Sequence, residues 1–196
     1  MPDALWSNAS LDKPPQAPEA WIDTLADAVE IDRLLKMGVL QKAEDCQDPV
    51  SGTLTARFVY DWRIKDSPDG GKKWMRRSRF VAREFATLKR HDTYSPATGL
   101  HTSNLVPLVY LRMLAESLEE SGDGAYGITL AALDIKDAFL QVPQEKLVEV
   151  SMYNQRYIIK RNLPGQHLGA KAWYCFFSES TCQRLSNANA ALNNLA

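Results

Sequence analysis

The stretch TLTARFVYDWRIK at residues 53–65 decides the fold, because apolar and polar side chains alternate along it from Leu54 to Lys65. Successive side chains of a β-strand point to opposite faces, so this period of two predicts a strand. The Pro, Asp and Gly of DSPDGGKK (66–73) predict a turn, and WMRRSRFVAREF (74–85) then predicts the return strand. Together they predict a long hairpin that is apolar on part of one face and carries Arg and Lys on the other.

Apolar residues at helical spacing predict three helices, over 21–38, 105–118 and 168–179. Gly38 supplies a stop for the first helix, since glycine readily adopts the left-handed conformation that ends helices. The Pro- and Ala-rich residues 1–20 are expected to be a disordered lead-in. Residues 180–196 are expected to be a divergent or disordered tail.

Two further segments predict strands. The apolar run YGITLAALDI (126–135) predicts a buried strand that carries Asp134 to its C-terminal end. The segments VEVSM (148–152) and RYIIK (156–160) predict a second, smaller hairpin. The expected fold class is α+β, with an antiparallel sheet built from the long hairpin and the Asp134 strand and with helices packed on it.

The net charge of -1 hides an uneven distribution along the chain. Residues 1–56 carry 4 Lys and Arg against 10 Asp and Glu, whereas residues 57–90 carry 11 against 4. A basic block between acidic flanks indicates a surface that meets an anion, and nucleic acid is the usual candidate. The alternative from charge alone is a solvated charged hairpin.

Cysteine and histidine spacing supports neither a zinc site nor a disulfide framework, which favours a reducing intracellular setting, cytoplasmic or nuclear. The residues concerned are Cys46, Cys175, Cys182, His91, His101 and His167. No apolar run reaches the length of a membrane span, and the N-terminus lacks the pattern of a secretory signal. We therefore expect no membrane partner.

The strongest chemical signal is LDIKDAFLQVP at residues 133–143. A carboxylate at the end of a buried strand is costly unless its charge is compensated, and a divalent cation can do this. An isolated aspartate there could simply cap the following turn. Here Asp134 is followed three residues later by Asp137, a small residue and an aromatic one, Phe139.

This pattern resembles the first catalytic motif of reverse transcriptases, and the likeness is closest to the polymerase of copia-type retrotransposons. Four more segments resemble that family in the same order: RRSRFVAREFA its "KARLVARGF", DTYSPAT its "ETFSPV", VEVSM its "EEVYM" and LPGQHLGAKAWY its "LYGLKQAPRAWY". The resemblance implies part of a polymerase right hand, with fingers and an incomplete palm. The implied parts are fingers over 21–100, a palm segment over 101–143 and a second fingers and palm part over 144–179, so that the first domain is interrupted.

The resemblance implies a catalytic role for Asp134, which would bridge two Mg²⁺ ions, with the Ile135 carbonyl as a further metal ligand. Such a pair of ions activates the primer hydroxyl and neutralises the leaving pyrophosphate. Asp137 and Ala138 would present backbone N–H groups to the triphosphate, although Asp137 could also be a helix N-cap. Phe139 would stack beneath the sugar and exclude ribonucleotides, the alternative being an ordinary core aromatic.

The basic hairpin would supply phosphate ligands, because guanidinium forks and ammonium groups suit phosphate oxygens. Arg79 is the leading triphosphate ligand, and Lys65 and Arg77 are second choices. Alternation predicts Arg77 and Arg79 on one strand face and Arg76 on the other. Arg76 and Arg83 are expected to contact template or solvent, and a surface ion-pair lattice is the alternative for any one of them.

The later loop resembles the family less closely, since Pro164 stands where the family has Tyr. The resemblance implies that Gln166 lies near the nucleotide and base pair. It also implies that Gly165 and Gly169 permit close approach of the backbone.

No Asp follows Asp137, so the aromatic-x-Asp-Asp motif of these polymerases is missing from this sequence. We therefore expect the chain by itself to be inactive, although the complete enzyme would bind template-primer and dNTP and synthesise DNA. One alternative is a non-catalytic nucleic-acid-binding remnant that uses the basic hairpin at 57–90. Another is a structural relic without activity.

Overall fold

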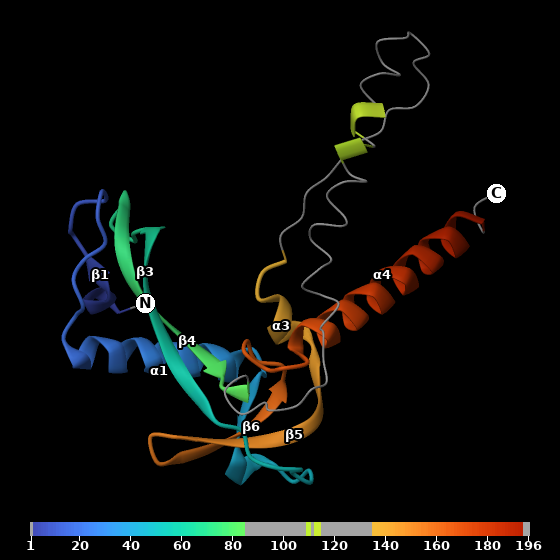
Figure 1. The fold of residues 1–196 in the computed structure, drawn as a ribbon, viewed down its shortest axis with the longest axis horizontal. Helices are drawn as coiled ribbons and strands as arrows, with labels where there is room; N and C mark the ends of the chain where they lie inside the picture. The colour runs from blue at the N-terminus through green and yellow to red at the C-terminus, as the bar shows by residue number, and fades with distance from the viewer. Residues whose placement is uncertain (1, 85–108, 111, 115–134, 194–196) are drawn as a thin grey trace. The chain divides into compact units, whose positions relative to one another are not determined.

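The computed structural model describes residues 2–84, 109–110, 112–114 and 135–193, with side chains as far as Arg184. Within these ranges the chain is α+β and contains two small antiparallel sheets (Figure 1). It divides into two compact units, which are described separately. The first consists of Met1–Lys89 and Phe139–Gly169, and the second of Arg90–Ala138 and Ala170–Ala196.

The first sheet confirms the long hairpin. Strand β3 (Ala56–Asp66) pairs antiparallel with β4 (Lys72–Ala82) along their whole length, with Asp61 opposite Arg77. The turn closes at Gly70 and Gly71, which adopt φ values of 91° and 77° that favour glycine. A short N-terminal strand, β1 (Trp6–Ser7), pairs with the other edge of β4 to give the order β1-β4-β3.

Part of the segment 1–20, expected to be a disordered lead-in, has regular structure at residues 3–7, where the chain meets this sheet. A 3₁₀ turn, η1 (Asp3–Leu5), precedes β1 and lies against both β4 and helix α1. The side chain of Leu5 is 1% exposed. Burial of this apolar side chain, together with the pairing of Trp6 opposite Met75, fixes the segment.

Helix α1 (Ala20–Lys36) confirms the first predicted helix and its stop. Gly38 has a φ of 66°, its N–H donates to the Leu35 carbonyl, and the Val39 N–H donates to the Leu34 carbonyl. This pair of bonds is the Schellman arrangement, which satisfies carbonyls that a helix end would otherwise leave open. The chain then enters β2 (Leu40–Lys42) and the 3₁₀ turn η2 (Ala43–Asp45).

The second sheet, ordered β2-β6-β5, confirms the smaller hairpin. Strand β5 (Pro143–Met152) pairs antiparallel with β6 (Gln155–Arg161), with a register shift between Pro143 and Val148. Tyr153 and Asn154 form the turn with φ values of 46° and 61°. Strand β2 pairs with the other edge of β6, so segments more than a hundred residues apart in sequence share one sheet.

One apolar core joins α1 to both sheets. Its buried members come from the end of α1, from β4, from the second sheet, from residue 140 and from the loop after β6, and they are Leu34, Val39, Leu40, Phe80, Ala82, Leu140, Val150, Tyr157, Ile159 and Leu163. This cluster explains why the residues after 139 belong to the same compact unit as the residues before 90.

Two more helices follow Asp137: α3 (Ala138–Gln141) and α4 (Gly169–Asn193). Helix α4 confirms the helix predicted at 168–179 and continues fourteen residues beyond Glu179, into the segment where a divergent or disordered tail was expected. No Gly or Pro follows Gly169, and nothing in the sequence therefore stops the helix.

Two predicted elements lie wholly or mostly outside the described residues. Of the helix expected at 105–118, residues 109–110 and 112–114 are described and are helical. Of the strand expected at 126–135, Ile135 is described and has no regular structure. The Asp134 strand was expected to join the sheet of the long hairpin. Among the described residues, the strands of that sheet are β1, β4 and β3.

Gly165 is placed where its backbone meets strand β4. Its φ is 88°, and a Cβ added there would lie 2.3 Å from the carbonyl oxygen of Ala82. The Ala82 N–H donates to the Pro164 carbonyl at 2.8 Å, which holds the loop against the strand. The close backbone approach expected for Gly165 is therefore made to the chain itself.

We predict that Gly165→Ala destabilises the fold by about 1–3 kcal/mol, because a positive φ and a backbone clash both oppose the added Cβ. Urea denaturation followed by circular dichroism measures the loss. Gly52→Ala is the matched control, since a Cβ there meets nothing within 4 Å. Equal midpoints for the two variants would contradict the role of Gly165.

Candidate functional site

The β3–β4 hairpin has two chemically different faces, because its pairing runs from Ala56–Ala82 to Asp66–Lys72 without a register shift. Even-numbered residues of both strands, such as Arg76 and Ser78, face helix α1. Odd-numbered residues, such as Arg77 and Arg79, occupy the opposite face. The predicted separation of Arg76 from Arg77 and Arg79 is confirmed.

The helix-facing side holds Arg76 in a structural role. Its guanidinium donates two hydrogen bonds to the Asp23 carboxylate, at 2.7 and 3.2 Å, and its side chain is 10% exposed. It also lies 5.3 Å from the ring centroids of both Tyr60 and Trp62. The expectation that Arg76 contacts template or solvent is therefore wrong, because α1 supplies its counter-charge.

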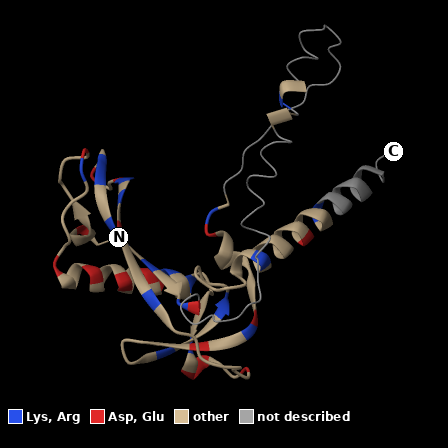
Figure 2. Cartoon of the chain, in the orientation of Figure 1, with Lys and Arg blue, Asp and Glu red and all other residues tan. Residues whose placement is uncertain are grey.

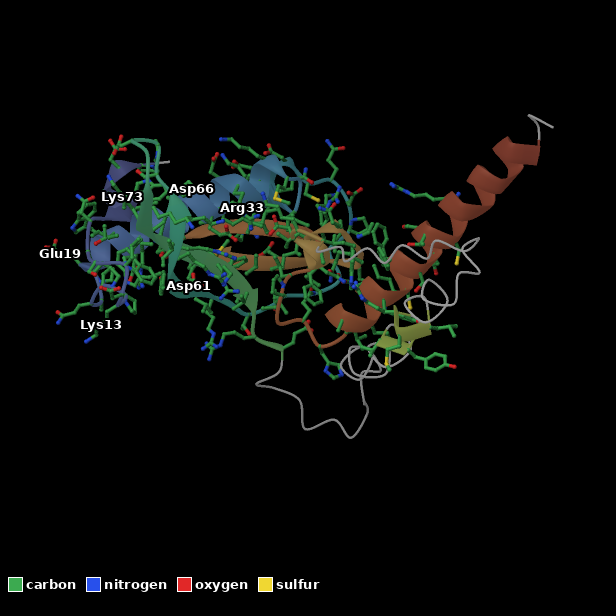
Figure 3. All side chains as sticks on the ribbon, turned by 90° about the horizontal axis from the view of Figure 1, so that it is seen from above. Lys13, Glu19, Arg33, Asp61, Asp66 and Lys73 are labelled. Carbon is green, nitrogen blue, oxygen red and sulfur yellow. The ribbon has the colours of Figure 1, made fainter. Side chains whose placement is uncertain are left out.

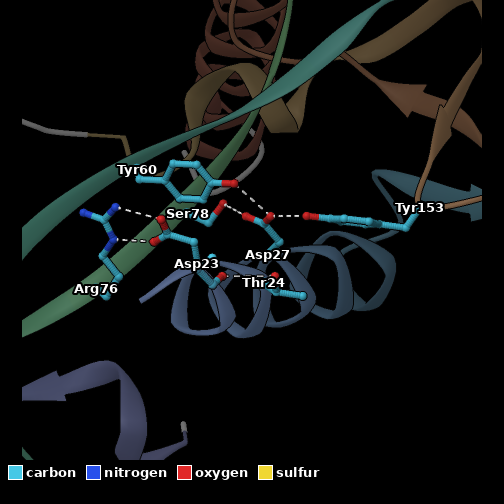
Figure 4. Close-up of polar contacts among 8 residues, drawn as sticks. Asp23, Thr24, Asp27, Tyr60, Arg76, Ser78 and Tyr153 are labelled. Atoms are coloured by element: carbon cyan, nitrogen blue, oxygen red, sulfur yellow. Dashed lines mark hydrogen bonds and ion pairs between the residues drawn. The ribbon is translucent and has the colours of Figure 1, made fainter. Parts of the chain in front are cut away.

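A buried carboxylate, Asp27, lies beside this ion pair (Figure 4). The hydroxyls of Tyr60, Ser78 and Tyr153 donate to its two oxygens at 3.0, 2.5 and 2.5 Å. These donors come from β3, β4 and the β5–β6 turn, so a single carboxylate connects helix α1 to both hairpins. Three hydroxyl donors compensate its loss of hydration.

Two of these hydroxyls hold their protons more tightly than usual. Burial, together with the Asp27 hydrogen bond and its negative charge, raises the pKa of Tyr153 to about 12. The same causes raise the pKa of Tyr60. Both groups therefore stay neutral donors to Asp27 through the physiological range.

Sequence reasoning did not find the Asp27 cluster. The available signal was the spacing of Asp23, Asp27 and Glu30, which places three acids on one face of α1. Because Asp27 and Glu30 are buried rather than solvated, this acidic face packs inward. The three hydroxyl donors could not be assigned from spacing, since they lie 33, 51 and 126 residues away along the chain.

Lys and Arg recur along both strands of the long hairpin (Figure 2), and the register places most of them on its outward face. Six cationic side chains and a single carboxylate, that of Asp61, alternate onto it from the two strands: Arg57, Arg63, Lys65, Lys73, Arg77 and Arg79. We call these seven residues the basic face. Lys65 lies directly opposite Lys73, whose Nζ atom forms an ion pair with Asp69 of the turn at 3.2 Å.

Asp61 lies midway along β3, opposite Arg77, and is labelled on the hairpin in Figure 3. Its Oδ2 atom accepts from Arg63 Nε at 3.0 Å and from Arg79 at 3.4 Å. Arg77, directly opposite Asp61 in the ladder, makes no hydrogen bond or ion pair with any residue that the structure describes. Burial lowers the pKa of Arg77, and the neighbouring charge of Arg79 lowers it further.

Lys65, Arg77 and Arg79, the three residues predicted to bind triphosphate, share this face, and Lys65 lies four and six register positions from Arg77 and Arg79. Arg83 follows β4, is exposed, and its N–H donates to the Thr55 carbonyl at 2.9 Å. The guanidiniums of the basic face suit phosphate oxygens, since each can donate two parallel hydrogen bonds. The arrangement can therefore bind an anion with several phosphates.

The predicted metal and triphosphate residues near Asp134 belong to a different unit. Asp134 itself lies outside the described residues, and Ile135 is exposed. Asp137 has a left-handed φ of 53° and directly precedes α3, whose first residue is Ala138. A usual N-cap residue is extended, so Asp137 does not have the usual N-cap backbone.

The residues expected beside the nucleotide contribute to packing in the first unit. Gln166 is buried, its Oε1 accepts from the Leu163 N–H at 2.7 Å and its Nε2 donates to Gln144 at 3.4 Å. Phe139 is partly buried, and its ring would lie 3.6 Å from a Cβ added at Gly169. These contacts fix the loop between β6 and α4.

The described residues offer two further observations. They contain no group of three or more His, Cys, Asp or Glu side chains that could hold a metal ion. A hollow of about 240 Å³ is lined by Lys42, Ala43, Glu44, Asn154, Gln155 and Arg156. Because its lining carries both signs of charge, with Lys42 paired to Glu44 at 3.6 Å, it favours neither anions nor cations.

Comparisons with protein-family models, curated proteins and solved structures find no match to this chain. No helix among the residues that the structure describes has the length and apolar character to cross a membrane. A functional assignment must therefore come from the residues and their geometry.

We predict that Asp27→Ala lowers the free energy of unfolding by about 1–3 kcal/mol, because it removes the buried acceptor shared by Tyr60, Tyr153 and the buried Ser78 hydroxyl. Chemical denaturation of the purified protein measures the change. Asp32→Ala on the exposed side of α1 removes the same charge and should cost less than about 0.5 kcal/mol. A similar loss in both variants would contradict the role of Asp27.

Proposed function

We propose that this chain binds nucleic-acid phosphates through the basic face, as the fingers and partial palm of a copia-type reverse transcriptase. The observation that carries the proposal is the placement of six cations with one carboxylate on a single face of a continuous hairpin. Phosphate contacts of this kind supply most of the affinity of proteins for nucleic acid.

The rigidity of the hairpin favours a ligand with repeating charges. Side chains two residues apart on one strand face are separated by about 6.5–7 Å, so the cations form two parallel rows. Like charges within and between the rows repel, as between Arg77 and Arg79, and an anion would relieve this repulsion. A single small anion could neutralise only part of such a surface.

The polymerase part of the proposal depends on the resemblance in LDIKDAFLQVP and the four segments that resemble the family in order. In the complete enzyme Asp134 and the Ile135 carbonyl would hold Mg²⁺, which prefers such oxygen ligands. Two Mg²⁺ ions, when bound, would supply the charge neutralisation that nucleotidyl transfer needs. Phe139 would select deoxynucleotides, and a longer chain would supply the second carboxylate pair.

A second candidate is a non-catalytic nucleic-acid-binding protein. The basic face favours it independently, because phosphate binding there needs neither Asp134 nor a metal. The two candidates predict different behaviour for a longer chain that contains this sequence. The polymerase would bind primer-template and incorporate dNTP, whereas the binding protein would bind without incorporation. Binding without incorporation would favour the second.

We predict that Arg77→Ala reduces the salt dependence of duplex binding, lowering the slope of log K against log salt concentration by about 1. The reason is that each phosphate contact releases counterions and contributes its own share of the slope. Fluorescence anisotropy of a labelled DNA duplex over a salt series measures it.

Arg156→Ala is the matched control for this prediction. Arg156 is an exposed arginine on β6, outside the basic face, with an ion pair to Glu149 at 3.4 Å. Arg156→Ala changes the net charge by the same amount as Arg77→Ala, and it should leave the slope of log K against log salt concentration unchanged. Equal effects of both variants, or salt-independent binding by the wild type, would contradict the proposal.

A second prediction concerns catalysis in a longer chain that contains this sequence and polymerises. Asp134→Asn should lower incorporation by several orders of magnitude, because it removes a ligand shared by both metal ions. Primer extension measures the rate, and unchanged duplex affinity shows that the fold survives. Retained incorporation would remove Asp134 from the metal site.

A further inference from the structure

We propose that Asp61 is an internal competitor for phosphate, whose carboxylate must release arginines of the basic face before a phosphate can occupy them. This inference rests on the proposed phosphate-binding function and adds a residue that sets its affinity. The ligand chemistry is that of phosphate oxygens, from a nucleic-acid backbone or from the triphosphate of a nucleotide.

The position of Asp61 is the first support. It is the single carboxylate that the two strands place on the basic face, and three arginines surround it. Arg77 lies directly opposite, Arg63 two residues along the same strand, and Arg79 diagonally across the ladder. The carboxylate therefore occupies the place where a phosphate would meet the most guanidinium groups.

The incomplete bonding of this cluster is the second support. A single oxygen of Asp61, Oδ2, accepts from both Arg63 and Arg79, the latter at 3.4 Å. The other oxygen, Oδ1, and the Nε of Arg79 have no hydrogen-bond partner among the described residues, although both atoms are buried. One carboxylate thus leaves hydrogen-bonding capacity unused in its neighbours, and a phosphate has more acceptor oxygens to offer.

The exposure of the cluster is the third support. The side chains of Arg63 and Arg79 are 50% and 40% exposed, whereas Arg76, in its bidentate pair with Asp23, is 10% exposed. Water and ions reach the arginine ends of the Asp61 pairs, while the Asp61 side chain is 25% exposed, and ion pairs open to water are weak. The Asp23–Arg76 pair holds the fold, and the Asp61 pairs are free to open.

A carboxylate and a phosphate compete for the same guanidinium donors, since both accept paired hydrogen bonds from the fork. Removing the carboxylate charge should therefore strengthen phosphate binding, although Asp61 is not itself a ligand. A ligand that also meets Lys65, Lys73 and Arg57 gains contacts that require no displacement of Asp61. The competition therefore falls hardest on short anions and least on a long phosphate chain.

The test measures the affinity of the full chain for a fluorescent DNA duplex by anisotropy at one fixed salt concentration. Asp61→Asn should tighten binding by about two- to fivefold, the equivalent of opening an exposed ion pair. Asp61→Glu keeps the charge and should stay near the wild type. Asp32→Asn removes the same charge from a pair with Lys36 on α1 and should change nothing.

A double-mutant cycle separates a local effect from a change in net charge. If Asp61 acts by occupying Arg79, the gain from Asp61→Asn should shrink when Arg79→Ala is also present. Circular dichroism and thermal melting of each variant confirm that the fold is retained. Tripolyphosphate, added as a competitor, reveals whether a free polyphosphate shares the Asp61 dependence, and the dependence of either ligand supports the inference.

The outcomes distinguish this inference from the function on which it rests. Salt-dependent duplex binding by the wild type, with no gain in Asp61→Asn for either the duplex or tripolyphosphate, would overturn the competitor role and leave phosphate binding intact. Equal gains in Asp61→Asn and Asp32→Asn, or an undiminished gain beside Arg79→Ala, would also overturn it. Absence of binding in both the wild type and Asp61→Asn would overturn both proposals.

Discussion

The unbroken register of the β3–β4 hairpin is the constraint on which the rest of this structure depends. Because side chains alternate between the faces of a strand, a slip of one residue would exchange every inward residue for an outward one. Arg76 and Ser78 would then lose Asp23 and Asp27, and the cations of the basic face would meet the helix. The register, in which Asp61 lies opposite Arg77, therefore decides which side chains face helix α1 and which form the basic face.

This register also explains the uneven charge of the sequence. The acidic N-terminal region is not a separate flank, since its helix α1 covers the inward face of the basic hairpin with Asp23 and Asp27. One arginine and three hydroxyls are satisfied there. Six of the eleven cations of residues 57–90 lie on the outward face with Asp61, so much of the positive charge of this segment is gathered on one surface.

Sequence reasoning succeeded where local periodicity determines structure and failed where distant contacts do. Both hairpins, helix α1 and its stop at Gly38 followed from alternation, helical spacing and glycine conformation. The regular structure of the N-terminal residues could not be predicted in this way, because it depends on the burial of Leu5 beside strands that come much later in the chain. The Asp27 cluster was missed for the same reason.

The candidate site was predictable in part. Alternation alone grouped Lys65, Arg77 and Arg79, and it separated them from Arg76, but it could not reveal that Asp23 holds Arg76 inside the fold. Gln166 and Gly165 had been assigned to a nucleotide, and their observed contacts are with Leu163, Gln144 and Ala82. Such contacts come from chain folding and leave no local pattern.

The central claim is that the two faces of one hairpin have different tasks, one holding helix α1 and the other binding phosphate. Arginine side-chain NMR spectra, recorded while a DNA duplex is titrated into the labelled protein, test this most directly. The account predicts that the Nε–H signals of Arg77 and Arg79 shift while that of Arg76 stays in place. A shift of Arg76 equal to theirs, or no shift of Arg77 and Arg79, would contradict it.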